Sequence, residues 1–416
     1  GEIKQANTYI EDPFHSFGRY DYVLANPPFN VDDVNLAKVE GDKRFNTYGI
    51  PRNKSDTKKK DKGAATVPNA NYLWINLFAT SLKPKGRAGL VMANSASDAR
   101  HSEADIRQKL IESNLIYAML TLPSNMFYTV TLPATLWFFD KGKTSDKILF
   151  IDARNVFTQI DRAHREFSPE QIQNIAIVSR LERGNRQAFT ELVDSYFTKG
   201  FEHLTENRAT LADVSQRVLQ FLKANNASTL PDFGAILKDA DKLLQTHASY
   251  AKSVDVKQIE KANTLQRKLA ETLTPFFTAM HSLLKETDKQ FRQLEADQAK
   301  NRDLKDLKSE LNNLHRAAKD SEYFFTHVQW LQERFREAKY DDVTGLCKLA
   351  SIDEVKEQEY SLNPGRYVGV VIEEDGRTEE EFIEEMLTLN SDLEKLNSEA
   401  HQLEKIIGKN IKLIAG

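Results

Sequence analysis

Short apolar runs rich in strand-forming residues recur through the first 150 residues, with helical patterns between them. Five runs have the composition of buried strands, and the last two are expected to be antiparallel: residues 22–25, 89–93, 116–120, 135–139 and 148–151. Residues 7–10 have the pattern of a further short strand. Helical spacing predicts helices over residues 72–82 and from residue 102, where residues 102–105 have the form of a cap. This alternation predicts an α/β domain.

A helical pattern replaces the alternation after residue 205 and continues to residue 340. Its clearest part has apolar residues three or four positions apart, broken at Ser321: Leu304, Leu307, Leu311, Leu314, Ala318, Phe325 and Val328. Long amphipathic helices of this kind pack against one another as a hairpin or bundle. The alternative is an arm that embraces DNA or docks a partner, and the spacing leaves both interpretations open.

The end of the chain carries a separate pattern of apolar residues at a and d positions, from Phe382 to Ile407. Such a seam needs another helix, either from the middle of this chain or from a partner. The residues that we expect to bind a partner are Leu389, Leu393, Leu396 and Leu403. The patterns predict five segments: an α/β domain (1–165), a linker (166–204), a helical arm or bundle (205–340), a short connecting region (341–376) and a C-terminal amphipathic helix (377–416).

Composition narrows the class of protein. Hydrophobic residues make up 40% and charged residues 28% of the 416 residues, which supports a core together with much exposed helix. The net charge of -4 gives no overall basic signature, so DNA affinity must come from local patches or from a partner. No apolar run approaches the ~18 residues of a membrane span and we see no secretory leader, so we expect a cytoplasmic protein. The histidines lack metal-binding spacing and no Walker-type loop occurs, so we predict neither a metal site nor ATP hydrolysis.

The candidate chemistry directly follows the predicted strand 22–25, in the sequence Asn26-Pro27-Pro28-Phe29. Because prolines fix the backbone and lack N–H donors, the carbonyl oxygens of this corner stay free as acceptors. Asn26 adds an amide oxygen and Phe29 adds a flat ring. Two acceptors beside a stacking surface suit methylation of an exocyclic amino group, as on adenine, after the base has been swung out of duplex DNA. A plain Pro-Pro turn with Phe29 in the core is the alternative.

Three further features bear on this hypothesis. Methylation of a cytosine ring carbon needs a cysteine nucleophile after the strand, whereas the single cysteine, Cys347, lies far downstream. Asp12 either faces a ligand at the sheet edge or is an exposed turn residue. Residues 52–62 hold six Lys or Arg against two Asp, and they form either a solvated loop or a DNA phosphate contact. The candidates for that contact are Lys58, Lys59 and Lys60.

Several further segments occur in an order that matches one known family. They are residues 26–30, 49–51, 69–74, 82–89, 106–112, 122–123, 126–128, 132–137 and 150–154, with a weaker match at 363–368. On these segments the chain resembles the modification (methyltransferase) subunit of type I restriction–modification systems, and the resemblance covers about residues 1–180 well.

The resemblance implies a Rossmann-like, S-adenosylmethionine-dependent methyltransferase that acts on the N6 amino group of adenine, with catalytic roles for Asn26, Pro27, Pro28 and Phe29. It also implies that Asp12, with Asn26, contacts the cofactor. The implied partners are double-stranded DNA, a specificity subunit, a restriction subunit and a second copy of this chain. The C-terminal helix would pair with the specificity subunit.

The sequence departs from the family upstream of the catalytic motif. The family carries a glycine-rich cofactor loop there, whereas the residues before Asn26 contain Gly1 and Gly18 and no such loop. Without the strand that bears this loop, strand 22–25 has an open hydrophobic edge. We therefore expect a partial methyltransferase sheet from a longer protein, with an incomplete cofactor site. A non-catalytic DNA-binding or assembly module is the alternative, and the helices after residue 200 argue against a stand-alone methyltransferase.

Overall fold

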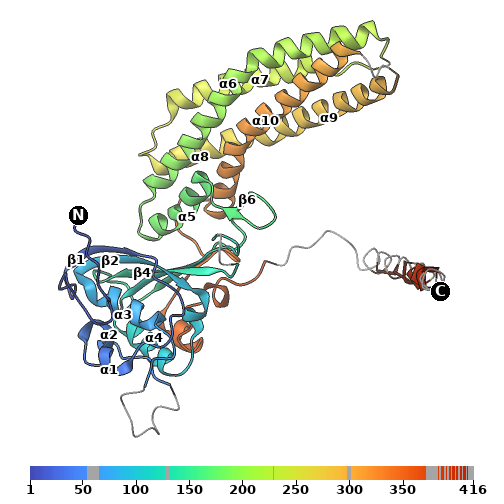
Figure 1. Cartoon of the computed structure of the whole chain (residues 1–416). Helices are drawn as coiled ribbons and strands as arrows, with labels where there is room; N and C mark the ends of the chain where they lie inside the picture. Colours follow the sequence, from blue (N-terminus) through green and yellow to red (C-terminus); the bar gives the residue numbers. More distant parts are fainter. Residues whose placement is uncertain are drawn as a thin grey trace. The chain divides into compact units, whose positions relative to one another are not determined.

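The computed structural model is divided into two units, residues 1–369 and residues 370–416. The first unit contains a sheet covered by helices and a bundle of long helices (Figure 1). No helix among the described residues is long and apolar enough to cross a membrane. The structure describes residues 1–53, 65–127, 131–227, 229–297 and 301–371, and part of residues 383–410.

A six-stranded sheet forms the centre of the first unit, in the order β1-β2-β4-β3-β5-β8. β1 is parallel to β2 and β3 is parallel to β5, whereas β4 is antiparallel to both of its neighbours and β8 is antiparallel to β5. The five predicted strands are all present, but residues 7–10 form a turn. The bounds are β1 (Tyr20–Ala25), β2 (Leu82–Ala93), β3 (Ile116–Thr121), β4 (Ala134–Asp140), β5 (Ile148–Asp152) and β8 (Cys347–Ala350).

Helices lie on both faces of this sheet (Figure 1). Along β3, Met119 packs towards α3 and α4, while Ala118 and Leu120 pack towards α5, because alternate side chains of a strand point to opposite faces. The layers are formed by α3 (Asn71–Ser81), α4 (Ser102–Glu112) and α11 (Ile352–Glu357) on one face and α5 (Pro169–Glu182) on the other. The short elements are α1 (Leu36–Val39), α2 (Lys43–Asn46), η3 (Asn94–Asp98), β6 (Thr158–Gln159), β7 (Arg165–Glu166) and η4 (Pro364–Arg366).

The predicted cap of α4 is wrong. His101 occupies the N-cap position and makes no side-chain capping bond. The Ser102 hydroxyl instead accepts from the backbone N–H of Arg52 at 2.9 Å and donates to its carbonyl at 3.1 Å. A contact with a residue 50 positions away therefore replaces the local bond that the sequence suggested.

The long helices pack as a bundle, as one of the two interpretations predicted. All seven spaced apolar residues of α10 are buried, and so is Ser321 at the break in the pattern. Residues 166–204, expected as a linker, form α5 and the first part of α6, because aromatic residues at helical spacing anchor α6 in the core. The helices are α6 (Gln187–Ala224), α7 (Phe233–Ser253), α8 (Ile259–Ala270), α9 (Leu273–Asp297) and α10 (Arg302–Arg334).

The expected connecting region after the bundle belongs to the sheet. β8 pairs with β5, and the Tyr367 ring stacks on Phe150 with centroids 3.8 Å apart and planes 8° from parallel. The buried guanidinium of Arg107 in α4 donates to the Tyr360 carbonyl at 2.7 Å. Residues 343–369 are therefore a structural part of the α/β region, although the bundle separates them from it in sequence.

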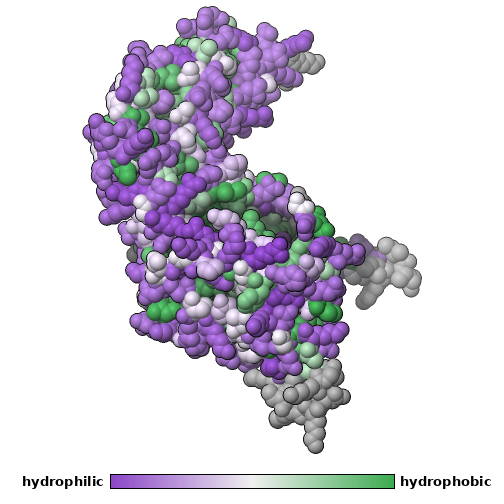
Figure 2. All heavy atoms as spheres, turned by 90° about the vertical axis from the view of Figure 1, so that its left-hand side faces the viewer, coloured by the Kyte–Doolittle hydropathy of each residue, from purple (hydrophilic) through white to green (hydrophobic). Residues whose placement is uncertain are grey.

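The opposite edge of the sheet is open. β1 has no strand on its outer side among the described residues, and its Tyr22 and Leu24 side chains are 76% and 88% exposed. The β1 side faces the viewer in Figure 2, where hydrophobic atoms surround a hollow. The face of the sheet that packs against α5 has an apolar cavity of about 440 Å³, lined by residues that include Tyr117, Leu136, Phe138 and Ile172. The expected open hydrophobic edge is therefore present.

The second unit contains the C-terminal pattern. Its described residues between 383 and 410 are helical. Leu393, Leu396 and Leu403 are 56%, 62% and 58% exposed, whereas Leu389 lies outside the described residues. Their role in binding a partner stays a prediction.

Candidate functional site

The motif of residues 26–29 lies at the carboxyl end of β1, immediately after Ala25, which pairs with Leu90 of β2. Asn26 and Pro28 are exposed, and Pro27 is buried. Phe29 is half-buried and packs against the hydrophobic cluster that runs from the sheet into the bundle. Part of the ring thus belongs to the core, as the plain-turn interpretation required, and part of it is accessible.

The two predicted acceptors of this corner are available. Among the described residues, none donates a hydrogen bond to the Asn26 side chain or to the Pro27 carbonyl oxygen. Pro27 and Pro28 have no N–H groups with which neighbouring carbonyls could be satisfied locally. The corner therefore presents an amide oxygen and a carbonyl oxygen that have no partners in the part of the chain that the structure describes, which is the arrangement that an incoming amino group would need.

Two further polar contacts hold the chain in place just beyond the carboxyl end of β2, the strand next to β1. The Thr135 hydroxyl of β4 donates to the Asn94 side-chain oxygen at 2.7 Å, just beyond the end of β2. The Tyr72 hydroxyl of α3 donates to the Ala96 carbonyl at 2.7 Å and so ties η3 to this helix. Burial raises the pKa of Tyr72, so the hydroxyl keeps its proton and continues to donate.

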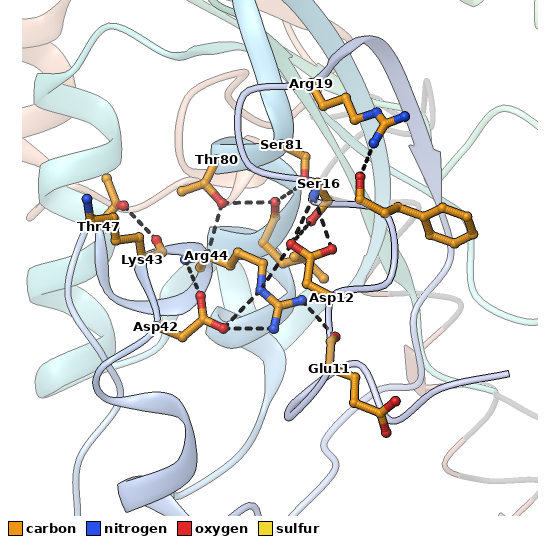
Figure 3. A network of polar contacts seen from close by, with 12 residues as sticks. Glu11, Asp12, Ser16, Arg19, Asp42, Lys43, Arg44, Thr47, Thr80 and Ser81 are labelled. Carbon is orange, nitrogen blue, oxygen red and sulfur yellow. Dashed lines mark hydrogen bonds and ion pairs between the residues drawn. The ribbon is translucent and has the colours of Figure 1, made fainter. Parts of the chain in front are cut away.

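Asp12 does not lie at the carboxyl ends of the strands, where the prediction of a ligand contact would place it. Its carboxylate accepts from the Ser16 backbone N–H at 2.9 Å and lies 3.7 Å from the Arg44 guanidinium (Figure 3). The adjoining segment is held at the end of α3, where the Gly18 and Arg19 N–H groups donate to the last carbonyls of that helix. This is the amino end of β1, roughly 17 Å of strand away from Asn26.

The network around Asp12 has a structural explanation. Arg44 is 5% exposed and donates to Asp42 at 2.7 Å and to the Glu11 carbonyl at 3.1 Å. A buried guanidinium needs such partners, and Asp12 is one of them. The sequence placed Asp12 before a proline and near a strand but could not show which end of the strand it would reach. The described residues therefore supply no cofactor contact through Asp12.

The remaining predicted residues fall into two groups. Lys58, Lys59 and Lys60 lie outside the described residues. Cys347 lies in β8, at the far edge of the sheet from β1, and burial raises the pKa of its thiol to about 12. A protonated, buried thiol at that position does not serve as a nucleophile beside Asn26.

The structure also places next to the motif several residues that the sequence does not identify as part of the site. Asn30 and Val31, directly after Phe29, are hydrogen-bonded to Asn71 and Ala70 at the start of α3. In the sequence, Asn71 stands out only as a member of the matching segment 69–74. Because these partners lie about 40 positions apart, no local pattern connects them.

Comparison with known proteins gives the family. The model of the family described as N-6 DNA Methylase matches residues 1–201 and 294–376, which is more than half of the chain. The chain belongs to the N-6 DNA methylase family. The match includes the motif after β1 and the downstream residues of β8 and η4, and it leaves out residues 202–293 of the bundle.

Individual relatives cover part of the chain. It is 38% identical over 181 residues to a Type I restriction enzyme MjaIX methylase subunit of Methanocaldococcus jannaschii, covering 42% of this chain and 30% of that protein. It is 32% identical over 166 residues to a Type I restriction enzyme HindI methylase subunit of Haemophilus influenzae, covering 39% of this chain and 34% of that protein. The chain thus spans about a third of the length of these relatives. A type I restriction-modification methyltransferase subunit from Streptococcus thermophilus matches with a TM-score of 0.34 and 24% identity, over 41% of this chain and 34% of that chain.

Proposed function

We propose that this chain carries the base-binding part of a DNA methyltransferase that methylates the N6 amino group of adenine within a type I restriction–modification complex. Family membership supports DNA methylation, and the curated relatives are type I methylase subunits. The observation that carries the proposal is the corner after β1, where the Asn26 amide and the Pro27 carbonyl have no described hydrogen-bond donor and Phe29 keeps part of its ring accessible.

In this proposal the adenine is swung out of the duplex and stacks on Phe29. The Asn26 side-chain oxygen and the Pro27 carbonyl oxygen each accept one N–H of the adenine amino group. These two bonds draw the nitrogen lone pair out of conjugation with the ring, so that it can take a methyl group, and one amino proton is then lost to solvent. Pro27 and Pro28 keep the corner rigid, so the acceptors need little reorganisation.

The proposed methyl donor is S-adenosylmethionine, whose sulfonium supplies a transferable methyl group. The described residues do not by themselves fit this cofactor, because Asp12 lies at the opposite end of β1 and is bound by Ser16 and Arg44. We therefore assign no cofactor contact to Asp12. The proposed partners are double-stranded DNA, a specificity subunit that selects the target and pairs with the C-terminal helix, a restriction subunit, and a second copy of this chain.

The test uses the complete methyltransferase that contains this chain, with its specificity subunit, target DNA and radiolabelled S-adenosylmethionine. Asn26→Ala and Phe29→Ala should abolish methyl transfer while the assembled complex elutes and binds DNA as before. Asn114→Ala, a substitution of a loop asparagine at the amino end of β3, serves as the control and should keep wild-type activity. Methyl transfer at the wild-type rate by Asn26→Ala would refute the proposal.

A further inference from the structure

The chain segment that follows the Asn26 corner is fastened to α3 by a pair of asparagines. The Asn30 backbone N–H donates to the Asn71 side-chain oxygen at 2.9 Å. The Asn71 side-chain nitrogen donates in return to the Asn30 side-chain oxygen at 2.8 Å. We propose that Asn71 is a positioning residue for methyl transfer, which holds Phe29 and the Asn26 corner in place through Asn30. This inference rests on the proposed function.

The geometry of the pair is specific to these side chains. Asn30 has a φ of +53°, in the left-handed region that asparagine tolerates better than most residues. Its backbone and its side chain both face Asn71, so one amide satisfies a donor and an acceptor of the same residue. Asn71 is 3% exposed, so its amide is shielded from water, whereas Asn30 is exposed.

Two further bonds extend this support to the two residues before Asn71. The Ala70 backbone N–H donates to the Val31 carbonyl at 2.8 Å, one residue beyond Asn30. The Asn71 backbone N–H donates to the Asn69 side-chain oxygen at 3.0 Å. Residues 69–71 thus form a rigid support at the start of α3, and the loop after Phe29 is bound to it at two consecutive residues.

The position of the pair explains why it matters for the reaction. Phe29 directly precedes Asn30, and it has only three residues between it and the end of β1. The loop is therefore fixed at one end by the sheet and at the other end by Asn71. Removing the Asn71 amide leaves the backbone bond between Ala70 and Val31 to hold the second end. The Phe29 ring and the acceptors can then shift from the geometry that the swung-out base requires.

The chain offers a matched control on the same helix. Asn76 of α3 is also buried, and its side-chain nitrogen donates to the Gly49 carbonyl at 2.9 Å. Asn76→Ala removes an amide of the same size from the same helix but touches no residue of the loop. A loss that comes only from damage to α3 should therefore be equal in Asn71→Ala and Asn76→Ala.

The experiment measures kcat, KM and base extrusion in the complete methyltransferase, with 2-aminopurine at the target position as a fluorescent probe of unstacking. We expect Asn71→Ala to lower kcat by about tenfold to a hundredfold, since small misplacements of reacting groups have effects of this size. The fluorescence increase on binding should shrink, and KM for S-adenosylmethionine should stay unchanged. Asn76→Ala should lower the melting temperature similarly but keep the wild-type kcat.

A double-mutant cycle separates positioning from simple loss of stability. Asn30→Gly keeps the left-handed backbone but removes the side-chain acceptor, so it should lower kcat as Asn71→Ala does. The double variant should lose little more than either single one, because both residues belong to one contact. The inference is overturned if Asn71→Ala and Asn76→Ala have the same kcat, or if the two losses multiply. Full activity of Asn26→Ala would instead overturn the proposed function.

Discussion

Gly200 lies in α6, where that helix packs against α10. The packing at this residue decides whether Gly200→Ala raises or lowers the free energy of unfolding. A Cβ atom at this position would lie 2.6 Å from both Cε1 and Cζ of Phe325. Carbon atoms in favourable contact are ~3.5–4.0 Å apart, so the ring would have to move by about 1 Å. The Phe325 ring is 5% exposed and contacts three other rings, with centroids 5.1 Å from Phe201, 5.6 Å from Phe277 and 6.3 Å from Phe197.

Gly200→Ala therefore brings two opposing effects. Alanine is favoured over glycine in a helix interior by ~1 kcal/mol. Overpacking a filled core costs about 1–3 kcal/mol, and a ring enclosed by other rings belongs at the upper part of that range. We expect the free energy of unfolding to fall by a net ~1–2 kcal/mol. Urea denaturation followed by far-ultraviolet circular dichroism measures this change.

The control replaces the obstructing ring. In a Phe325→Leu background the close contact is gone, so adding Gly200→Ala should raise the free energy of unfolding by up to ~1 kcal/mol. The effect of the same substitution thus changes sign with residue 325, which is the signature of direct contact. An increase in stability from Gly200→Ala alone would refute the close packing of α6 on α10 at this point.

Two further predictions concern the sheet region. Hydrogen bonds from Lys348 and from the Ser351 backbone lower the pKa of Glu354 to about 2, so the stabilisation by its carboxylate is complete above pH 4.5 and is lost as the pH falls through 2. Because this side chain is 39% exposed, Glu354→Gln should remove only ~1 kcal/mol of unfolding free energy at pH 6 and nothing near pH 2. Denaturation at both pH values measures the difference. Leu24→Glu, at a side chain that is 88% exposed, should reduce light scattering by the concentrated chain and change stability by less than ~0.5 kcal/mol. Leu90→Glu, at a side chain that is 1% exposed, should prevent folding, and equal effects of the two substitutions would contradict the open edge.

The sequence predicted those parts of the fold that depend on local periodicity. The buried strands and the helices of the bundle follow from runs and spacings in which the core residues are also the pattern, as in α10. The motif after β1 was found for a similar reason, because an Asn-Pro-Pro-Phe corner after a short apolar run combines a strand end with unusual chemistry. The carboxyl end of β1 is where the structure places it.

The features that escaped prediction depend on contacts between distant residues. β8 has four residues, too few for a pattern, and it becomes a strand by pairing with β5 about 200 positions earlier. Asn71 appears as an ordinary helix residue until Asn30 lies beside it. Asp12 was expected to follow a short strand over residues 7–10 and was a candidate to face a ligand at the sheet edge, but those residues form a turn and the Asp12 carboxylate is bound by Ser16 and Arg44 near the amino end of β1.

The bundle also contributes to the assembly of the sheet, which follows from how its two ends are joined. Arg186, just before α6, donates to the Ala338 carbonyl at 2.9 Å and to the Glu337 carbonyl at 2.8 Å, just after α10. One guanidinium thus joins the beginning and the end of the segment from α6 to α10, at the base of the bundle. Part of the segment that the family model leaves out, residues 202–293, also reaches this base, where Glu260 accepts from Arg186 at 2.8 Å and the Asn263 side chain donates to the Arg336 carbonyl at 2.8 Å. The paired ends deliver β8 and η4 to the sheet, and for that reason a defect between α6 and α10 should weaken the edge of the sheet that lies farthest from Asn26.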